Sequence, residues 1–155
     1  MDIYEAYSEI KKIRDVRQFT GILYGLSFVG VALFFTMMLG GDFTDCMVAG
    51  VAGLAMAITQ WALVPFGFNS FFLNMISTLS MALTAVGFQR FVFANMNIDL
   101  VIIGGIMPIV PGVIFTTAMR DTLNGDYTAG VSRMLETGVV AFAVAVGVAL
   151  AYVIL

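Results

Sequence analysis

Five charged side chains lie between two apolar segments near the C-terminal end of the chain: Arg120, Asp121, Asp126, Arg133 and Glu136. A carboxylate buried in a membrane protein resists ionisation and can carry a proton. Asp121 and Glu136 are nearest to the apolar residues, so we expect both to be partly buried. Arg120 cannot share a helix face with Asp121, because adjacent helical residues differ by about 100°. We therefore expect the partner of Asp121 to be Arg133 or the turn around Asp126. These residues would gate a pathway or couple it to protons; the alternative is a solvated, mutually paired loop.

A second candidate is the stretch "GGIMPIVPG", residues 104–112, within an apolar run. Proline lacks a backbone donor and clashes with the preceding turn, so Pro108 and Pro111 predict a broken helix near Gly112. A half-helix starting near residue 113 would point its free N–H groups into the membrane, where a substrate carboxylate could bind. Thr116 and Thr117, one turn further on, would supply hydroxyl groups. The alternative is a kinked helix that only packs against its neighbours.

Polar residues also form a stripe in the segment around residues 71–88. At helical spacing, its four members lie within about 40° of one direction, so the stripe would not face lipid. Asn74 and Ser77 are therefore candidates for the lining of a polar path. The other interpretation is hydrogen bonding between helices, which is worth only about 0.6 kcal/mol on average. The four members are Ser70, Asn74, Ser77 and Thr84.

Composition indicates what kind of elements must position these residues. The chain of 155 residues is 61% hydrophobic and only 11% charged, with a mean hydropathy of +1.01, whereas soluble domains carry about 25% charged residues. It is therefore an integral membrane protein. The absence of histidine and the single Cys46 exclude an internal disulfide and histidine catalysis and argue against a Cys/His metal site. We expect no enzyme, no cofactor and no face for nucleic acid.

The apolar runs predict an all-α integral membrane protein with five transmembrane helices, the fourth of which is broken at Pro108–Gly112. The expected spans are residues 19–39, 46–64, 71–88, 98–119 and 134–155. Five crossings place six basic residues on the side of the N-terminus and only Arg90 on the other side. The positive-inside rule then puts the N-terminus in the cytoplasm and the C-terminus outside.

The chain divides into residues 1–17, a cytoplasmic amphipathic helix, and residues 18–155, a five-span membrane domain. The apolar face of the first part consists of Ile3, Ala6, Tyr7, Ile10 and Ile13. This helix would lead into the first span or dock against another domain or subunit.

Small residues repeat every four positions in three of the expected spans, which lets helices approach closely in lipid or slide past one another. These residues are Gly21 and Gly25; Ala49, Gly53 and Ala57; and Ala141, Ala145 and Ala149.

The stretch "MPIVPGVIFTTAMRDTLNGDYTAGVSRMLE" resembles the signature of the threonine/serine exporter family. Residues 17–45 are similar to the first span and Gly-Gly-Asp loop of the same family, and the resemblance covers the chain from about residue 5 onwards. The signature positions here are Pro111, Gly112, Asp121, Gly125, Asp126, Gly130 and Arg133.

The resemblance implies a secondary-active, multi-pass exporter of small hydroxy amino acids in a bacterial or archaeal inner membrane, driven by the proton gradient. Family members consist of two five-span halves, and this chain resembles the first half. It would pair with a companion second-half subunit or with itself. That half usually carries a larger cytoplasmic domain, of which residues 1–17 would be a remnant or lead-in.

Two alternatives remain open. Some related pairs are linked to dicarboxylate export, so the chain could be half of a dicarboxylate exporter. It could also be a non-transporting scaffold or assembly subunit whose prolines are only kinks. The scaffold hypothesis predicts a dry, well-packed region around Pro111, without a cavity.

Overall fold

The computed structural model describes residues 21–155, which form helices joined by short turns, with no strand in this range. The predicted amphipathic helix of residues 1–17 lies outside the described residues. The elements are α2 (Gly21–Met38), α3 (Phe43–Leu63), the 3-10 helix η1 (Val64–Phe66), α4 (Ser70–Phe91), α5 (Ile98–Ile106), α6 (Gly112–Leu123) and α7 (Tyr127–Ile154).

Local chemistry accounts for several helix ends. Asp42 caps α3 in a reciprocal capping box with Asp45, which satisfies two backbone donors that a helix N-terminus otherwise leaves free. Asp126 caps α7 by accepting a hydrogen bond from the N–H of Ala129 at 3.1 Å. Gly125, just before this cap, has a φ of 88°, a conformation that glycine adopts without steric cost. α7 therefore begins seven residues before the expected position 134.

The core lies where α2, α3, α4 and α5 meet. Ala32, Ala52, Met56 and Met81 are fully buried there. Backbones approach closely at small residues: a Cβ atom on Gly53 would lie 2.9 Å from the carbonyl oxygen of Phe28. Such approaches maximise dispersion contacts between helices where lipid removes the hydrophobic driving force.

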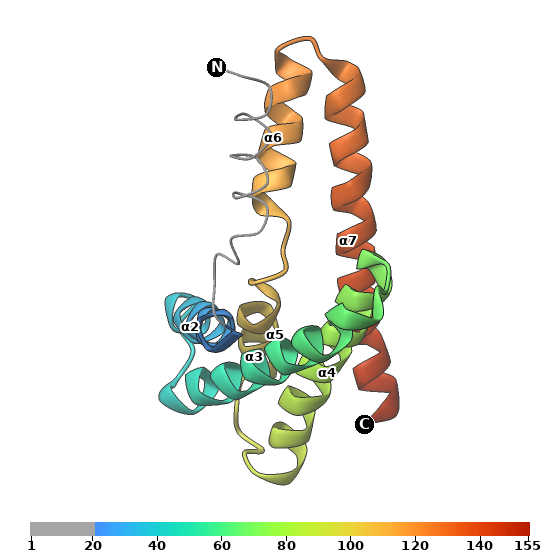
Figure 1. Ribbon diagram of the computed structural model, residues 1–155. Coiled ribbons are helices and arrows are strands. Elements are labelled where there is room, and N and C mark those ends of the chain that lie inside the picture. The colour runs from blue at the N-terminus through green and yellow to red at the C-terminus, as the bar shows by residue number, and fades with distance from the viewer. Residues whose placement is uncertain (1–20) are drawn as a thin grey trace.

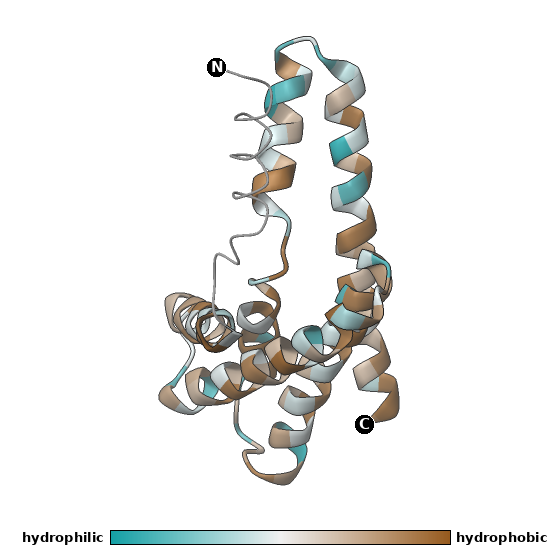
Figure 2. Ribbon diagram, viewed as in Figure 1, coloured by the Kyte–Doolittle hydropathy of each residue, from teal (hydrophilic) through white to brown (hydrophobic). Residues whose placement is uncertain are grey.

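Four helices are long and apolar enough to cross a membrane: α2, α3 with η1, α4 and α7. At 1.5 Å per residue, α5 is about 14 Å long and α6 about 18 Å long, and neither alone spans a hydrocarbon core of about 30 Å. Apolar residues predominate along α2–α5 and the second half of α7, whereas hydrophilic residues lie on the loops and along the hairpin of α6 and the first half of α7 (Figure 2). The protein is thus an all-helical, multi-pass membrane protein, and the fifth span stays a prediction.

The arrangement divides the described chain into a helix cluster and a projecting hairpin. α6 and the first half of α7 stand away from α2–α5, while the second half of α7 packs along α4 (Figure 1). In this view α3 runs across the direction of α7. α7 is therefore the element that connects the hairpin to the cluster.

Candidate functional site

Residues 107–111 separate α5 from α6 and contain both prolines. The N–H of Met107 bonds to the carbonyl of Gly104 at 3.3 Å, and the N–H of Val110 bonds to Ile106 at 3.2 Å. After these turns, the N–H of Gly112 reaches back only to Val110, at 2.8 Å. The regular helical hydrogen bonds from each N–H to the carbonyl four residues earlier stop here, because Pro108 and Pro111 have no N–H to donate.

The first turn of α6 leaves backbone donors free. Pro111 occupies the N-cap position and offers no side-chain cap. Among the residues that the structure describes, no acceptor pairs with the N–H groups of Val113 and Ile114. Thr116 and Thr117 both donate their hydroxyl hydrogens to the carbonyl of Val113, at 3.0 and 2.7 Å. This end of α6 therefore carries partial positive charge and two hydroxyl groups held by one carbonyl.

An apolar cavity of about 500 Å³, open to the surface, adjoins the interruption. Ile102 and Ile106 of α5 form one side, Val110 and Pro111 close it at the interruption, and α7 forms the other side. The α7 wall includes all three alanines of the small-residue stripe, Ala141, Ala145 and Ala149. Every lining side chain is apolar. Of the predicted substrate-binding residues, only Pro111 lines this cavity.

The α6–α7 hairpin holds the predicted ion pair. The Arg133 Nη1 atom lies 3.1 Å from Asp121 Oδ2, and the Asp121 side chain is 24% exposed. Oδ2 is shielded from solvent and has no aligned hydrogen bond, so the contact is an ion pair only. The backbone carbonyl of Asp121 also accepts a hydrogen bond from the N–H of Asp126 at 3.0 Å. Of the two partners expected for the Asp121 carboxylate, the structure has Arg133, whereas the contact with the turn is made by the Asp121 backbone alone. The functional role of Asp121 stays a prediction.

Tight packing at Gly130 joins the two helices of the hairpin. A Cβ atom at this position would lie 2.2 Å from the Thr122 hydroxyl oxygen and 3.1 Å from the Ala118 carbonyl oxygen. Only glycine fits such an approach, so α6 and the start of α7 pack backbone against backbone at this position.

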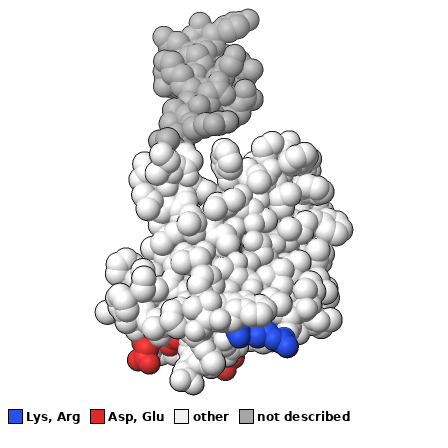
Figure 3. Space-filling view, turned by 90° about the horizontal axis from the view of Figure 1, so that it is seen from below, with Lys and Arg blue, Asp and Glu red and all other residues white. Residues whose placement is uncertain are grey.

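Glu136 differs from the expectation, because its side chain is exposed. The expectation that it is partly buried was wrong, since α7 begins at Tyr127 and Glu136 lies in its third turn, on a face that α6 does not cover. Arg120 is exposed as well. Charge elsewhere is sparse: the face seen from below carries charged side chains only along one edge (Figure 3).

The polar stripe of α4 faces partly inward. Ser77 is fully buried and donates to the carbonyl of Leu73 at 2.7 Å. Asn74 is half-buried, and the Thr84 hydroxyl donates to the carbonyl of Ser80 at 2.8 Å. Neither Asn74 nor Ser77 lines either of the two cavities described for residues 21–155. The structure does not bring these two residues together with Thr116 and Thr117, and their role in binding stays a prediction.

Sequence reasoning missed a buried carboxylate, Asp45, which is 3% exposed. Its Oδ1 accepts a hydrogen bond from the N–H of Asn97 at 3.0 Å, and its Oδ2 accepts one from the N–H of Asp42 at 3.1 Å. Asp45 thus ties the start of α3 to the start of α5. The spacing of the two aspartates, three residues apart before an apolar run, is the capping-box signal that could have revealed it.

The fold and the site first define a class: a multi-pass helical membrane domain whose charged hairpin joins an apolar helix cluster at a proline-rich interruption. The family model described as "Putative threonine/serine exporter" (ThrE) matches residues 1–155, the whole chain. The chain therefore belongs to the threonine/serine exporter family, which is a family of transporters. No curated protein and no solved structure matches the chain. The resemblance that the sequence suggested is thus confirmed.

Proposed function

We propose that this chain exports threonine, serine or a similar small hydroxy amino acid across a bacterial or archaeal inner membrane, by proton antiport. The observation that carries this proposal is the family match over the whole chain. A carrier needs a place where backbone groups can meet a substrate within the membrane, and the interruption between α5 and α6 supplies free donors.

In this proposal α5, residues 107–111 and α6 together make one crossing, the fourth in chain order, which brings the number of crossings to five. Their helical lengths add up to about 32 Å, close to the hydrocarbon thickness of about 30 Å. With five crossings, six basic residues lie on the cytoplasmic side and Arg90 lies outside. The N-terminus would then be cytoplasmic and the C-terminus external.

The substrate carboxylate would bind at the start of α6, at the free N–H groups of Val113 and Ile114. Thr116 and Thr117 would rotate their hydroxyls from the Val113 carbonyl toward the hydroxyl of the substrate. Asn74 and Ser77 would join this site after a rearrangement that uncovers α4. A substrate that carries both a carboxylate and a hydroxyl matches these donors and acceptors.

The cavity beside Pro111 favours transport over the scaffold alternative. A prolyl kink that served only packing predicts a filled region there, whereas a cavity of about 500 Å³ adjoins it. No basic side chain lines this cavity, so no observation on the described residues favours the dicarboxylate alternative.

Asp121 would couple export to protons or hold a gate, with Arg133 as its partner. The two roles predict different effects of substitutions on export. If the ion pair is a gate, Asp121→Asn and Arg133→Gln impair export to a similar degree, and the double variant is no worse than either. If Asp121 carries the proton, Asp121→Asn abolishes the pH dependence of export and Arg133→Gln retains it.

A companion five-span subunit, or a second copy, would pack against α6. In the described chain α6 contacts chiefly α7, and Val113 and Leu123 on it are 80% and 82% exposed. Such a partner would enclose the start of α6 and exclude lipid from the substrate site.

Efflux of labelled threonine from preloaded vesicles tests the proposal, with this chain alone and with a companion half. The expected result is efflux that depends on an imposed proton gradient. Asp99→Asn is the matched control, because Asp99 is an exposed carboxylate at the start of α5. Efflux that ignores the gradient would instead indicate a channel, and no efflux in either arrangement would favour the scaffold alternative.

A further inference from the structure

Two chain segments connect the hairpin of α6 and the first half of α7 to the helix cluster: residues 107–111 and the middle of α7. In the described chain α6 contacts chiefly α7, whereas α5 contacts α2, α3 and α4. Within the hairpin, the two helices pack backbone against backbone at Gly130. Elements with few contacts to the rest of a fold are the ones that move in conformational changes. The hairpin is thus held together internally and only loosely held by the cluster.

The elements on the cluster side of both segments are packed tightly. A Cβ atom on Gly104 would lie 3.0 Å from the Ala32 carbonyl oxygen, and one on Gly105 would lie 2.7 Å from Met81 Sδ, so α5 is wedged between α2 and α4. On α7, Gly147 lies equally close to the backbone of α4. The two segments therefore start from fixed points of the cluster.

The middle of α7 has the features of a hinge. The Thr137 hydroxyl donates to the carbonyl of Arg133 at 2.9 Å, and such bonds to the carbonyl four residues earlier often bend helices. In the part of the chain that the structure describes, Thr137 is the one residue with such a bond that directly precedes a glycine. A Cβ atom on Gly138 would meet nothing within 4 Å. Leu135 and Val139 beside it are 67% and 51% exposed, so little packing holds this part of α7 straight.

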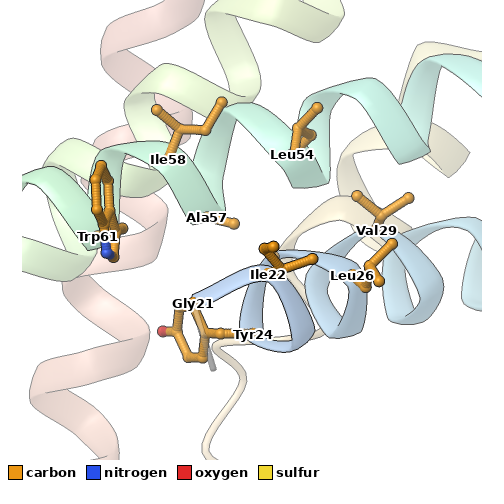
Figure 4. A pocket seen from close by; sticks show the side chains of 10 residues that line it. Gly21, Ile22, Tyr24, Leu26, Val29, Leu54, Ala57, Ile58 and Trp61 are labelled. Carbon is orange, nitrogen blue, oxygen red and sulfur yellow. The ribbon is translucent and has the colours of Figure 1, made fainter. Parts of the chain in front are cut away.

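Empty space adjoins the same two segments. The cavity of about 500 Å³ is lined by α5, by Val110 and Pro111 of the first segment, and by α7 from Ala141 onwards. A larger cavity, of about 730 Å³, lies between α2 and α3 (Figure 4), but its lining comes from these two helices alone. Only the first of these cavities therefore lies where a movement of the hairpin would change its shape.

We propose that the hairpin swings as one body relative to the helix cluster. Residues 107–111 form the first hinge, because the regular helical hydrogen bonds stop there. Thr137 and Gly138 form the second hinge, within α7. Because Val110 and Pro111 belong both to the first hinge and to the cavity wall, the swing widens or narrows the cavity beside the interruption.

The expected amplitude follows from the length of the swinging part. From Tyr127 to Thr137, α7 rises by about 15 Å at 1.5 Å per residue. A kink of about 20° at the second hinge then displaces the tip of the hairpin by about 5 Å. Such a displacement is large enough to be resolved by distance measurements between spin labels.

Double electron–electron resonance between pairs of nitroxide labels in lipid nanodiscs tests the swing. The labels are attached to introduced cysteines in a chain that carries Cys46→Ala. One label replaces Leu123, at the tip of the hairpin, and the other replaces Phe43 or Val64, at the two ends of α3; these side chains are 82%, 79% and 61% exposed. In one or both pairs we expect two distances that differ by up to about 5 Å. The pair Leu123 and Leu135, within the hairpin, should show a single distance.

Variants of the second hinge test where the swing arises. The difference in helix propensity between glycine and alanine corresponds to about a fivefold change in a population ratio. Gly138→Ala is therefore expected to shift the ratio of the two distances by about fivefold. The matched control is Gly87→Ala on α4, where an added Cβ also meets nothing within 4 Å, and it should leave the ratio unchanged. Thr137→Val keeps the shape of the side chain without its hydroxyl and should shift the ratio in the same direction as Gly138→Ala.

A single narrow distance in both hairpin–cluster pairs would overturn the proposal. Two distances between Leu123 and Leu135 would also overturn it, because the hairpin would then not move as one body. So would an equal ratio of distances in the Gly138→Ala and Gly87→Ala variants. The measurements need neither substrate nor a proton gradient, so this proposal and the proposed export fail separately.

Discussion

At Gly147, α7 packs closely against the backbone of α4. A Cβ atom there would lie 2.6 Å from the Met75 carbonyl oxygen, 3.0 Å from Thr78 Cβ and 3.1 Å from the backbone nitrogen of Leu79. Two of these three atoms belong to the backbone of α4, which cannot rotate away as a long side chain can. An alanine at this position must therefore push the helices apart.

The size of the effect follows from two opposing terms. Overpacking a tight site costs about 1–3 kcal/mol, and replacing a helical glycine by alanine gains about 1 kcal/mol. We expect Gly147→Ala to destabilise the protein by about 0–2 kcal/mol. Gly138→Ala, on the same helix, meets nothing within 4 Å and should stabilise it by about 1 kcal/mol. The two variants should therefore differ by about 1–3 kcal/mol.

Cys46 provides the assay, because it is the only cysteine and is 7% exposed. Its reaction with a thiol-reactive fluorophore in detergent follows thermal unfolding. For a chain of this length, 1 kcal/mol corresponds to about 2–4 °C in Tm, so the two variants should differ by about 2–12 °C. Equal Tm values would refute the argument that the crossing of α4 and α7 depends on a missing Cβ.

Three further predictions concern other parts of the chain. Asp45→Asn should lower the free energy of unfolding by about 1–3 kcal/mol, because one backbone N–H loses its carboxylate acceptor. The control is Asp99→Asn at an exposed carboxylate, and equal stability of the two variants would contradict the role of Asp45 in joining α3 to α5. The fully buried Thr78 hydroxyl has no hydrogen-bond partner among the described residues. Thr78→Val should therefore leave stability unchanged or raise it, because it removes a desolvation cost of about 1–3 kcal/mol. A clear loss of stability would show that the hydroxyl has a partner. Cysteines introduced at Ser8 and Leu155, in a chain without Cys46, should react from opposite sides of the membrane, and labelling from the same side would exclude an odd number of spans.

The sequence alone determined features that depend on local chemistry. Membrane insertion follows from composition, since 61% hydrophobic residues cannot be buried in one small soluble core. Pro108 and Pro111 lie in the non-helical residues between α5 and α6 because each lacks the donor that a helix requires. The pairing of Asp121 with Arg133 was also predictable, because a short turn places the residues on either side of it next to each other. Whether α5 and α6 form one interrupted crossing stays a prediction.

Only the tertiary structure decided which of several equivalent patterns are used for packing. Ala49 and Gly53 are buried in the helix cluster, whereas Gly21 and Gly25 have the same spacing and line an open groove between α2 and α3. The spacing of small residues defines a smooth helix face, but only the positions of the other helices determine whether that face is covered. Asp45 shows the same limit: its second acceptor bond goes to Asn97, 52 residues away. Contacts over such separations depend on how the helices pack, which no local pattern encodes.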